Sequence, residues 1–182
     1  MRVYLAGPDV FLPDPLKIAE AKKEICQNYG FEGVFPFDAS LDFSNLTPRE
    51  TAIKIYHCNI NLMNSCDLII ANMTPFRSPS LDAGTAFEMG YMTALGKPIF
   101  GYSNDSRLYP ERVLNKTSET LDQDGLLIEQ FEMIDNLMLE AAIINSGGEV
   151  ISEAVEPQQY YTELRVFKKV VKIAADQLFN SS

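Results

Sequence analysis

Apolar positions in the first part of this chain fall into short runs and helical stripes that alternate along the sequence. Residues 2–6 form a short run of the kind found in strands. Residues 15–29 carry apolar side chains at helical spacing, and Gly30 follows as a stop signal. Residues 31–36 form another short apolar run. We therefore expect strand, helix and strand in this order.

The next helix and strand have stronger local signals. Thr47, Pro48 and Glu50 form a capping-box pattern with proline in the first turn, which predicts a helix that runs to about Ser65. Residues 67–72 are almost continuously apolar, which is typical of a strand covered on both faces of a parallel sheet. This segment is the clearest strand in the sequence.

The remaining segments extend the same alternation. A polar, proline-rich loop over residues 74–81 leads into a predicted helix over residues 82–95, and residues 97–102 are predicted to form a strand. Residues 103–125 show no clear periodicity, and so long a loop indicates a functional segment. A further helix is expected over residues 136–145.

Apolar spacing from residue 157 to 179 predicts a final amphipathic helix packed on the sheet. Together the elements indicate an α/β fold, a single domain over residues 1–182, built as a flavodoxin-like or Rossmann-like three-layer sandwich with a mainly parallel sheet. Ligands of such folds bind at the carboxyl ends of the strands. This rule selects the loops after Ala6, Phe37, Asn72 and Tyr102.

Composition narrows the function classes. The chain has 182 residues, 46% of them hydrophobic, and its formal net charge is −10. Such a charge repels phosphate backbones, so nucleic acid is not an expected partner, and no apolar run is long enough to predict a membrane span. Cys26, Cys58 and Cys66 lie in apolar segments without metal-site spacing, which indicates free thiols and a cytoplasmic location. We expect neither a metal site nor an organic cofactor.

The segment from residue 67 to 91 carries the most chemistry, because Asp67, Asp82 and Glu88 are expected around one strand end. Gly84 and Thr85 share the broad side of the helix on which Glu88 projects. Each carboxylate also has a structural interpretation. Glu88 fits a solvated side chain near a helix start, Asp82 fits an N-cap on the amide of Thr85, and Asp67 fits a group bonded by a neighbouring loop.

Three further polar groups have open alternatives. Tyr4 fits a core aromatic as well as a catalytic group, and Asn59 and Asn61 fit surface positions of a helix as well as ligand contacts. Tyr4, Asp67, Asp82 and Glu88 all fall at or near the ends of adjacent predicted strands, which favours a role at the site.

The motifs resemble those of the nucleoside 2-deoxyribosyltransferases over roughly residues 2–145. Residues 3–7 (Val-Tyr-Leu-Ala-Gly) are similar to the family's first strand and glycine turn. Residues 59–67 (Asn-Ile-Asn-Leu-Met-Asn-Ser-Cys-Asp) resemble its Asn-rich helix and aspartate strand, and residues 82–91 (Asp-Ala-Gly-Thr-Ala-Phe-Glu-Met-Gly-Tyr) resemble its nucleophile helix. Residues 135–138 (Asp-Asn-Leu-Met) resemble a segment that enters the neighbouring subunit's site.

The resemblance implies a step of nucleoside salvage, in which Glu88 attacks C1′ of a 2′-deoxynucleoside and forms a covalent deoxyribosyl ester. A second nucleobase then attacks the same carbon, with net retention. Tyr4 would orient Glu88, and Asp67 and Asp82 would contact the base. The implied substrate contacts are Gly7, Asn61, Phe76, Gly84, Thr85, Asn136 and Met138. The implied partners are 2′-deoxynucleosides, free nucleobases and further copies of the chain, in a homodimer or larger homo-oligomer with shared sites.

Three alternatives remain at this stage. An N-glycoside hydrolase of nucleosides or nucleoside 5′-monophosphates would use the same fold, with Arg77, Ser78 and Ser80 as phosphate contacts, although Asp82 would repel that phosphate. A cytokinin-activating phosphoribohydrolase shares part of the motif around Glu88 but requires glycines that this chain lacks. The third alternative is a nucleotide-binding module without catalysis.

Overall fold

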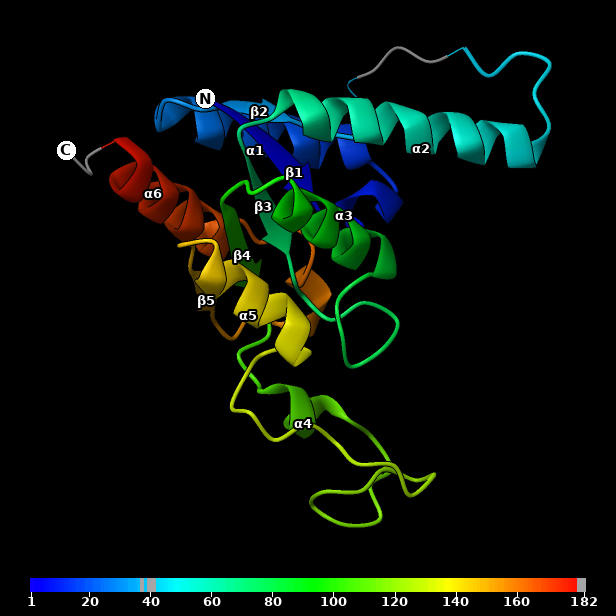
Figure 1. Ribbon diagram of the computed structural model, residues 1–182, viewed down its shortest axis with the longest axis vertical. Coiled ribbons are helices and arrows are strands. Elements are labelled where there is room, and N and C mark those ends of the chain that lie inside the picture. Colours follow the sequence, from blue (N-terminus) through cyan, green and yellow to red (C-terminus); the bar gives the residue numbers. More distant parts are fainter. Residues whose placement is uncertain (37, 39–41, 180–182) are drawn as a thin grey trace.

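The computed structural model of the protein describes residues 1–36, 38 and 42–179. In this part of the chain all strands are parallel and form one sheet, in the order β2-β1-β3-β4-β5 (Figure 1). The strands are β1 (Arg2–Ala6), β2 (Glu32–Val34), β3 (Leu68–Asn72), β4 (Ile99–Ser103) and β5 (Val150–Ser152). The expected α/β fold with a parallel sheet is therefore confirmed.

Helices cover both faces of the sheet. On one face lie α1 (Pro15–Asn28) and α6 (Arg165–Phe179), whose apolar sides share a buried core with Val3, Leu5, Leu68 and Phe100. On the other face lie α2 (Pro48–Ser65), α3 (Ala83–Ala94) and α5 (Leu137–Asn145), which share a second core with Tyr4, Ile69, Ala71 and Ile99. The central strands β1, β3 and β4 therefore contribute alternate residues to two cores, which explains the continuous apolar run of β3. No helix of the described residues has the length and apolar character that a membrane crossing requires.

Local signals explain the helix starts. The hydroxyl of Thr47 accepts a hydrogen bond from the amide of Glu50 at 3.3 Å, and the Glu50 carboxylate accepts one from the Thr47 amide at 2.8 Å. This is the predicted capping box, and α2 runs to Ser65 as expected. Asp82 caps α3 in a similar way by accepting the amide of Thr85 at 3.0 Å.

The sequence pattern was wrong about the start of the last helix and did not reveal β5. Residues 157–159 form a separate 3-10 turn, η2, and α6 begins at Arg165. The side-chain Nδ2 of Asn104 donates to the backbone carbonyls of Tyr160 and Glu163, at 2.6 and 3.0 Å. These carbonyls are therefore hydrogen-bonded to Asn104 and not to a following turn of helix. The strand β5 has three residues and pairs with β4 alone, so its sequence carries little periodic signal.

The segment between β4 and α5 has little regular structure. Its short helix α4 (Tyr109–Arg112) belongs to a region that projects away from the sheet in Figure 1, beyond the amino end of α5. This is the long loop that the sequence predicts. Its return at residues 134–136 lies beside the loop that precedes α3, because Leu81 and Asp135 are hydrogen-bonded there.

Gly148 allows the chain to pass close to β4. A Cβ atom at this position would lie 1.7 Å from the Ile99 carbonyl oxygen, which is backbone and does not rotate away. We expect Gly148→Ala to destabilise the protein by about 1–3 kcal/mol in urea unfolding. Gly90→Ala is the matched control, since nothing lies within 4 Å of that added Cβ, and we expect it to stabilise α3 by about 0.5–1 kcal/mol. Equal unfolding midpoints for the two variants would contradict this account.

Candidate active site

A cavity of about 450 Å³ opens at the carboxyl edge of the sheet, beside β1. In the observed strand order, the chain moves outward from β1 to β2 and then returns to pair β3 on the other side of β1. The loops after β1 and β3 therefore diverge, and such a switch point is where parallel α/β sheets bind ligands. The residues that line the cavity are Gly7, Val10, Phe11, Pro36, Ile55, Asn59, Asp82, Gly84, Thr85 and Glu88. Phe37, the residue after which the second predicted loop begins, lies outside the described residues.

Glu88 and Tyr4 form the central contact of this cavity. The fully buried Tyr4 hydroxyl donates a hydrogen bond to the Glu88 carboxylate, with 2.6 Å between the oxygens. Burial raises the pKa of Glu88 to about 7, the Tyr4 hydrogen bond lowers it, and the negative charge of Asp82 raises it. Burial also raises the pKa of Tyr4 far above its usual value, so the phenol remains a donor. The cavity thus holds a carboxylate that ionises near neutral pH.

Asp82 holds the start of α3 and also faces the cavity. Its Oδ2 accepts from the amide of Thr85 and from the Thr85 hydroxyl at 3.2 Å, and no described residue donates to Oδ1. Gly84 makes this arrangement possible, because a Cβ there would lie 2.9 Å from Oδ2. The N-cap and ligand-facing interpretations of Asp82 are therefore compatible.

Phe11 forms an aromatic wall of the cavity. Its ring stacks on Phe76 with 5.2 Å between centroids and 12° between planes, and the Arg77 guanidinium lies 4.5 Å from the Phe76 centroid and 5.1 Å from that of Phe11. Phe76 therefore supports the wall from behind and is not among the lining residues. Phe76 was predicted to contact the substrate, but Phe11 is the aromatic residue that lines the cavity.

The Asn61 prediction is wrong about which helix face meets the cavity. Asn61 is exposed, whereas Asn59 lines the cavity and its buried Oδ1 has no hydrogen-bond partner among the described residues. Two residues apart on a helix, the side chains point in opposite directions. Ile55, four residues before Asn59, also lines the cavity, and this spacing is the signal that would have identified the correct asparagine.

Asp67 is not part of this site. It precedes β3, at the amino edge of the sheet, where its exposed carboxylate accepts the Arg2 amide at 2.7 Å. The prediction that three carboxylates lie together is wrong for Asp67. Asp67 precedes β3 and lies at the amino edge of the sheet, whereas Asp82 and Glu88 come after β3 and lie at its carboxyl edge. Asp82 and Glu88 remain together.

Asn136 and Met138 lie at the start of α5, and neither lines the cavity of their own chain. The side-chain Oδ1 of Asn136 accepts the backbone amide of Met138 at 3.0 Å, and the side-chain Nδ2 of Asn136 donates to Glu129 at 2.5 Å. The Met138 side chain is 70% exposed. Their predicted contact with a neighbouring subunit's substrate remains a prediction.

A buried ion pair fixes the loop after β1, and the sequence motifs did not reveal it. Asp9 and Lys22 are both 1% exposed, with 2.5 Å between Oδ2 and Nζ, and the Asn72 amide donates to the other Asp9 oxygen at 3.2 Å. A Cβ at Gly7 would lie 2.6 Å from Asp9 Oδ2, so glycine is required there. The pair holds the 3-10 turn η1 (Pro8–Phe11), which supplies part of the cavity wall.

Comparisons with known proteins agree with the geometry. The profile of the nucleoside 2-deoxyribosyltransferase family matches residues 3–138. An uncharacterized protein of Schizosaccharomyces pombe is 35% identical over an alignment that covers 90% of this chain and 86% of that protein. The structure of 2-desoxiribosyltransferase from Leishmania mexicana is 30% identical, with a TM-score of 0.65, and the match covers 94% of this chain and 97% of that chain.

A conserved protein from Enterococcus faecalis V583 is 20% identical with a TM-score of 0.59, and the match covers 96% of this chain and 98% of that chain. This second structural match concerns the fold. The family match, in contrast, spans every residue that lines the cavity.

The Glu88 carboxyl group is expected to titrate with a midpoint near 7, as measured by NMR on protein with labelled glutamate and assigned by comparison with Glu88→Gln. Tyr4→Phe removes the hydrogen bond that favours the charged form, so the midpoint should rise. Tyr91→Phe is the control, because the Tyr91 hydroxyl donates to Asn64 at 2.8 Å and not to Glu88. A midpoint near 4.5 in the unaltered protein would show that the carboxylate is solvated.

Proposed function

This chain belongs to the nucleoside 2-deoxyribosyltransferase family, and we propose that it transfers a 2-deoxyribosyl group between nucleobases through a covalent ester on Glu88. The observation that carries the proposal is the Glu88 carboxylate itself, which faces the cavity, accepts a hydrogen bond from Tyr4 and ionises near neutral pH. The alignment of this chain with the Leishmania mexicana enzyme along nearly its whole length supports the same reaction.

The proposed first step breaks the bond between C1′ and the base. The ionised Glu88 oxygen supplies the electron pair of the new ester bond, and the departing base keeps the pair of the broken bond. Positive charge develops on the sugar in this step, and the adjacent carboxylate stabilises it. Tyr4 limits the rotation of Glu88 and so holds one oxygen in place.

In the second step an incoming base attacks C1′ from the face that the first base left, and the Glu88 carboxylate departs. Two inversions give net retention at C1′. We assign the free Oδ1 of Asp82 and the unpaired Oδ1 of Asn59 to the base, as acceptors for its N–H groups. The departing base takes up one proton from solvent, and the incoming base releases one to solvent when its bond to C1′ forms. The apolar wall of Phe11 suits a planar ring.

We extend the proposal to an assembly in which copies of the chain share sites. Five exposed apolar side chains occur in the sequence between the end of α4 and the first turn of α5, the segment that also contains Asn136 and much of which projects away from the sheet in Figure 1. They are Leu114, Leu126, Leu127, Phe131 and Met138, with 76%, 64%, 84%, 57% and 70% exposure. A second copy that covers them would bring Asn136 and Met138 to its own cavity. The three free thiols fit a reducing compartment, and we place the enzyme in the cytoplasm.

The reaction is tested by incubating the purified protein with deoxyinosine or thymidine and free adenine, and separating the products by chromatography. We expect deoxyadenosine to form at a rate that rises with pH through about 7, because the nucleophile must lose its proton. Glu88→Ala should reduce the rate by more than about 10³-fold. Free base without deoxyadenosine would indicate a hydrolase, and unchanged activity in Glu88→Ala would exclude the proposed nucleophile.

The assembly is tested by Leu127→Asp, which places a charge on the most exposed leucine of the group. We expect a smaller species in analytical ultracentrifugation and a loss of transfer activity, because each site would lack its neighbour's contacts. Leu16→Asp is the matched control, since Leu16 is 57% exposed at the first turn of α1, where an acidic side chain is favourable. Full activity of a monomeric Leu127→Asp variant would contradict the shared site.

A further inference from the structure

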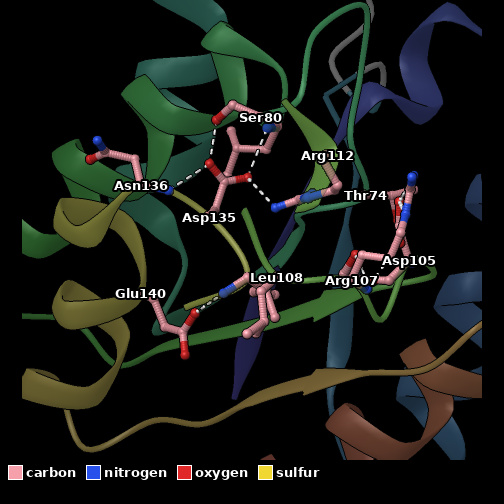
Figure 2. A network of polar contacts seen from close by, with 12 residues as sticks. Thr74, Ser80, Asp105, Arg107, Leu108, Arg112, Asp135, Asn136 and Glu140 are labelled. Carbon is pink, nitrogen blue, oxygen red and sulfur yellow. Dashed lines mark hydrogen bonds and ion pairs between the residues drawn. The ribbon is translucent and has the colours of Figure 1, made fainter. Parts of the chain in front are cut away.

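A buried carboxylate outside the cavity controls the loop that leads to Asp82. Asp135 is 1% exposed and lies just before α5. Its Oδ1 accepts the Ser80 hydroxyl and, at 2.8 Å, the Asn136 amide, and its Oδ2 accepts the Leu81 amide at 2.9 Å. Figure 2 shows these groups converging on Asp135 from the loop before α3 and from the start of α5. One side chain thus ties together segments more than fifty residues apart.

The anchored residues are adjacent to the proposed chemistry. Leu81 directly precedes Asp82, the N-cap of α3, and Glu88 lies on the same helix. The rest of the loop is turned back on itself, because the Phe76 amide donates to the Ser80 carbonyl at 3.0 Å and Arg77 has a left-handed backbone with φ of 58°. The hydrogen bonds of Ser80 and Leu81 to Asp135 therefore fix the direction in which this loop enters α3.

Arg112 supplies the opposite charge. Its guanidinium is buried, with Nη2 3.9 Å from Asp135 Oδ2, and its three nitrogens have no hydrogen-bond partner among the described residues. Burial lowers the pKa of Arg112 and the charge of Asp135 raises it. A buried guanidinium without a nearby anion is strongly unfavourable, so the pairing holds Arg112 and Asp135 together in the fold. Asp135 uses both carboxylate oxygens as acceptors for the loop before α3.

We propose that Asp135, paired with Arg112, is a positioning residue for deoxyribosyl transfer, which fixes Leu81 and thereby sets Asp82 relative to Glu88. The inference rests on the proposed roles of Asp82 and Glu88. Loss of the anchor lets the start of α3 shift, which moves Asp82 away from the base and away from Glu88. Displacements of this kind reduce turnover because the reacting groups no longer meet in the correct geometry.

The test is Asp135→Asn, which preserves size but removes one acceptor and introduces a donor toward Ser80 and Leu81. We expect kcat to fall about 10- to 100-fold, with a smaller change in KM. The acidic limb of the kcat/KM profile should move to lower pH, because Asp82 raises the pKa of Glu88 less when it lies farther away. Simple loss of folded protein would lower the rate equally at every pH.

Asp105→Asn is the matched control. Asp105 belongs to the same segment, is 3% exposed and pairs with Arg107 at 2.6 Å (Figure 2). Its charge also acts on Arg112, but its carboxylate makes no hydrogen bond to the described residues of the loop before α3, so the variant isolates that loop contact. We expect its kcat and its pH profile to remain those of the unaltered enzyme. An equal shift of the acidic limb in both variants would overturn the specific role of Asp135.

Hydrogen exchange of the Leu81 amide separates this inference from the proposed reaction. Asp135→Asn should accelerate exchange at Leu81, whether or not the protein transfers deoxyribose. If Asp135→Asn does not fold, Ser80→Ala removes one hydrogen bond to the same carboxylate and should show the same changes at smaller size. A folded Asp135→Asn variant with unchanged kcat, pH profile and Leu81 exchange would overturn the proposal, and so would an unchanged Ser80→Ala if it is the only variant that folds.

Discussion

The pairing of β1 with β3 is the constraint on which the site depends. Their register places Ala6, the last residue of β1, beside Ala71, so Gly7 lies next to Asn72, the last residue of β3. Asn72 then bonds to Asp9, which turns the first loop over the cavity, while the loop after β3 leads in the other direction toward α3. Any slip in this register would separate the two halves of the site. Parallel strands tolerate no such slip here, because both faces are buried.

The sequence predicted what depends on near neighbours. The capping pattern at Thr47 and Glu50, the N-cap at Asp82 and the apolar run of β3 are local signals, and the structure follows them. The errors concern relations between distant segments or between faces. Asp67 was predicted at the carboxyl end of the strands but lies at the amino end of β3, and Asn61 was predicted to face the cavity but lies on the exposed face of α2. Contacts such as those of Asp9 with Lys22 and Asp135 with Arg112 join segments that no spacing rule connects.

Asp9, Asp135 and Glu88 are carboxylates of two kinds. Asp9 and Asp135 each face a buried cation, and each holds a loop in place. Glu88 has no cation within ion-pair distance among the described residues, and a phenol is its one hydrogen-bond donor there. A carboxylate paired with a cation is a poor nucleophile because its charge is already compensated. The charge of ionised Glu88 is not compensated in this way, so it can stabilise the positive charge that develops on the sugar in the proposed reaction. The absence of a cationic partner therefore distinguishes the proposed nucleophile from the two carboxylates that hold loops.

Because the pKa of Glu88 is raised from 4.5 to about 7, folding and proton uptake are linked. Between these two values the folded protein binds more protons at Glu88 than the unfolded chain does. The contribution of this group to stability is therefore complete below about pH 4.5 and is lost as the pH rises through about 7. The ionised state that would attack the sugar is the state that favours the fold least. A bound ligand whose sugar carries partial positive charge would offset this conflict, so occupancy of the cavity and stability at neutral pH should increase together.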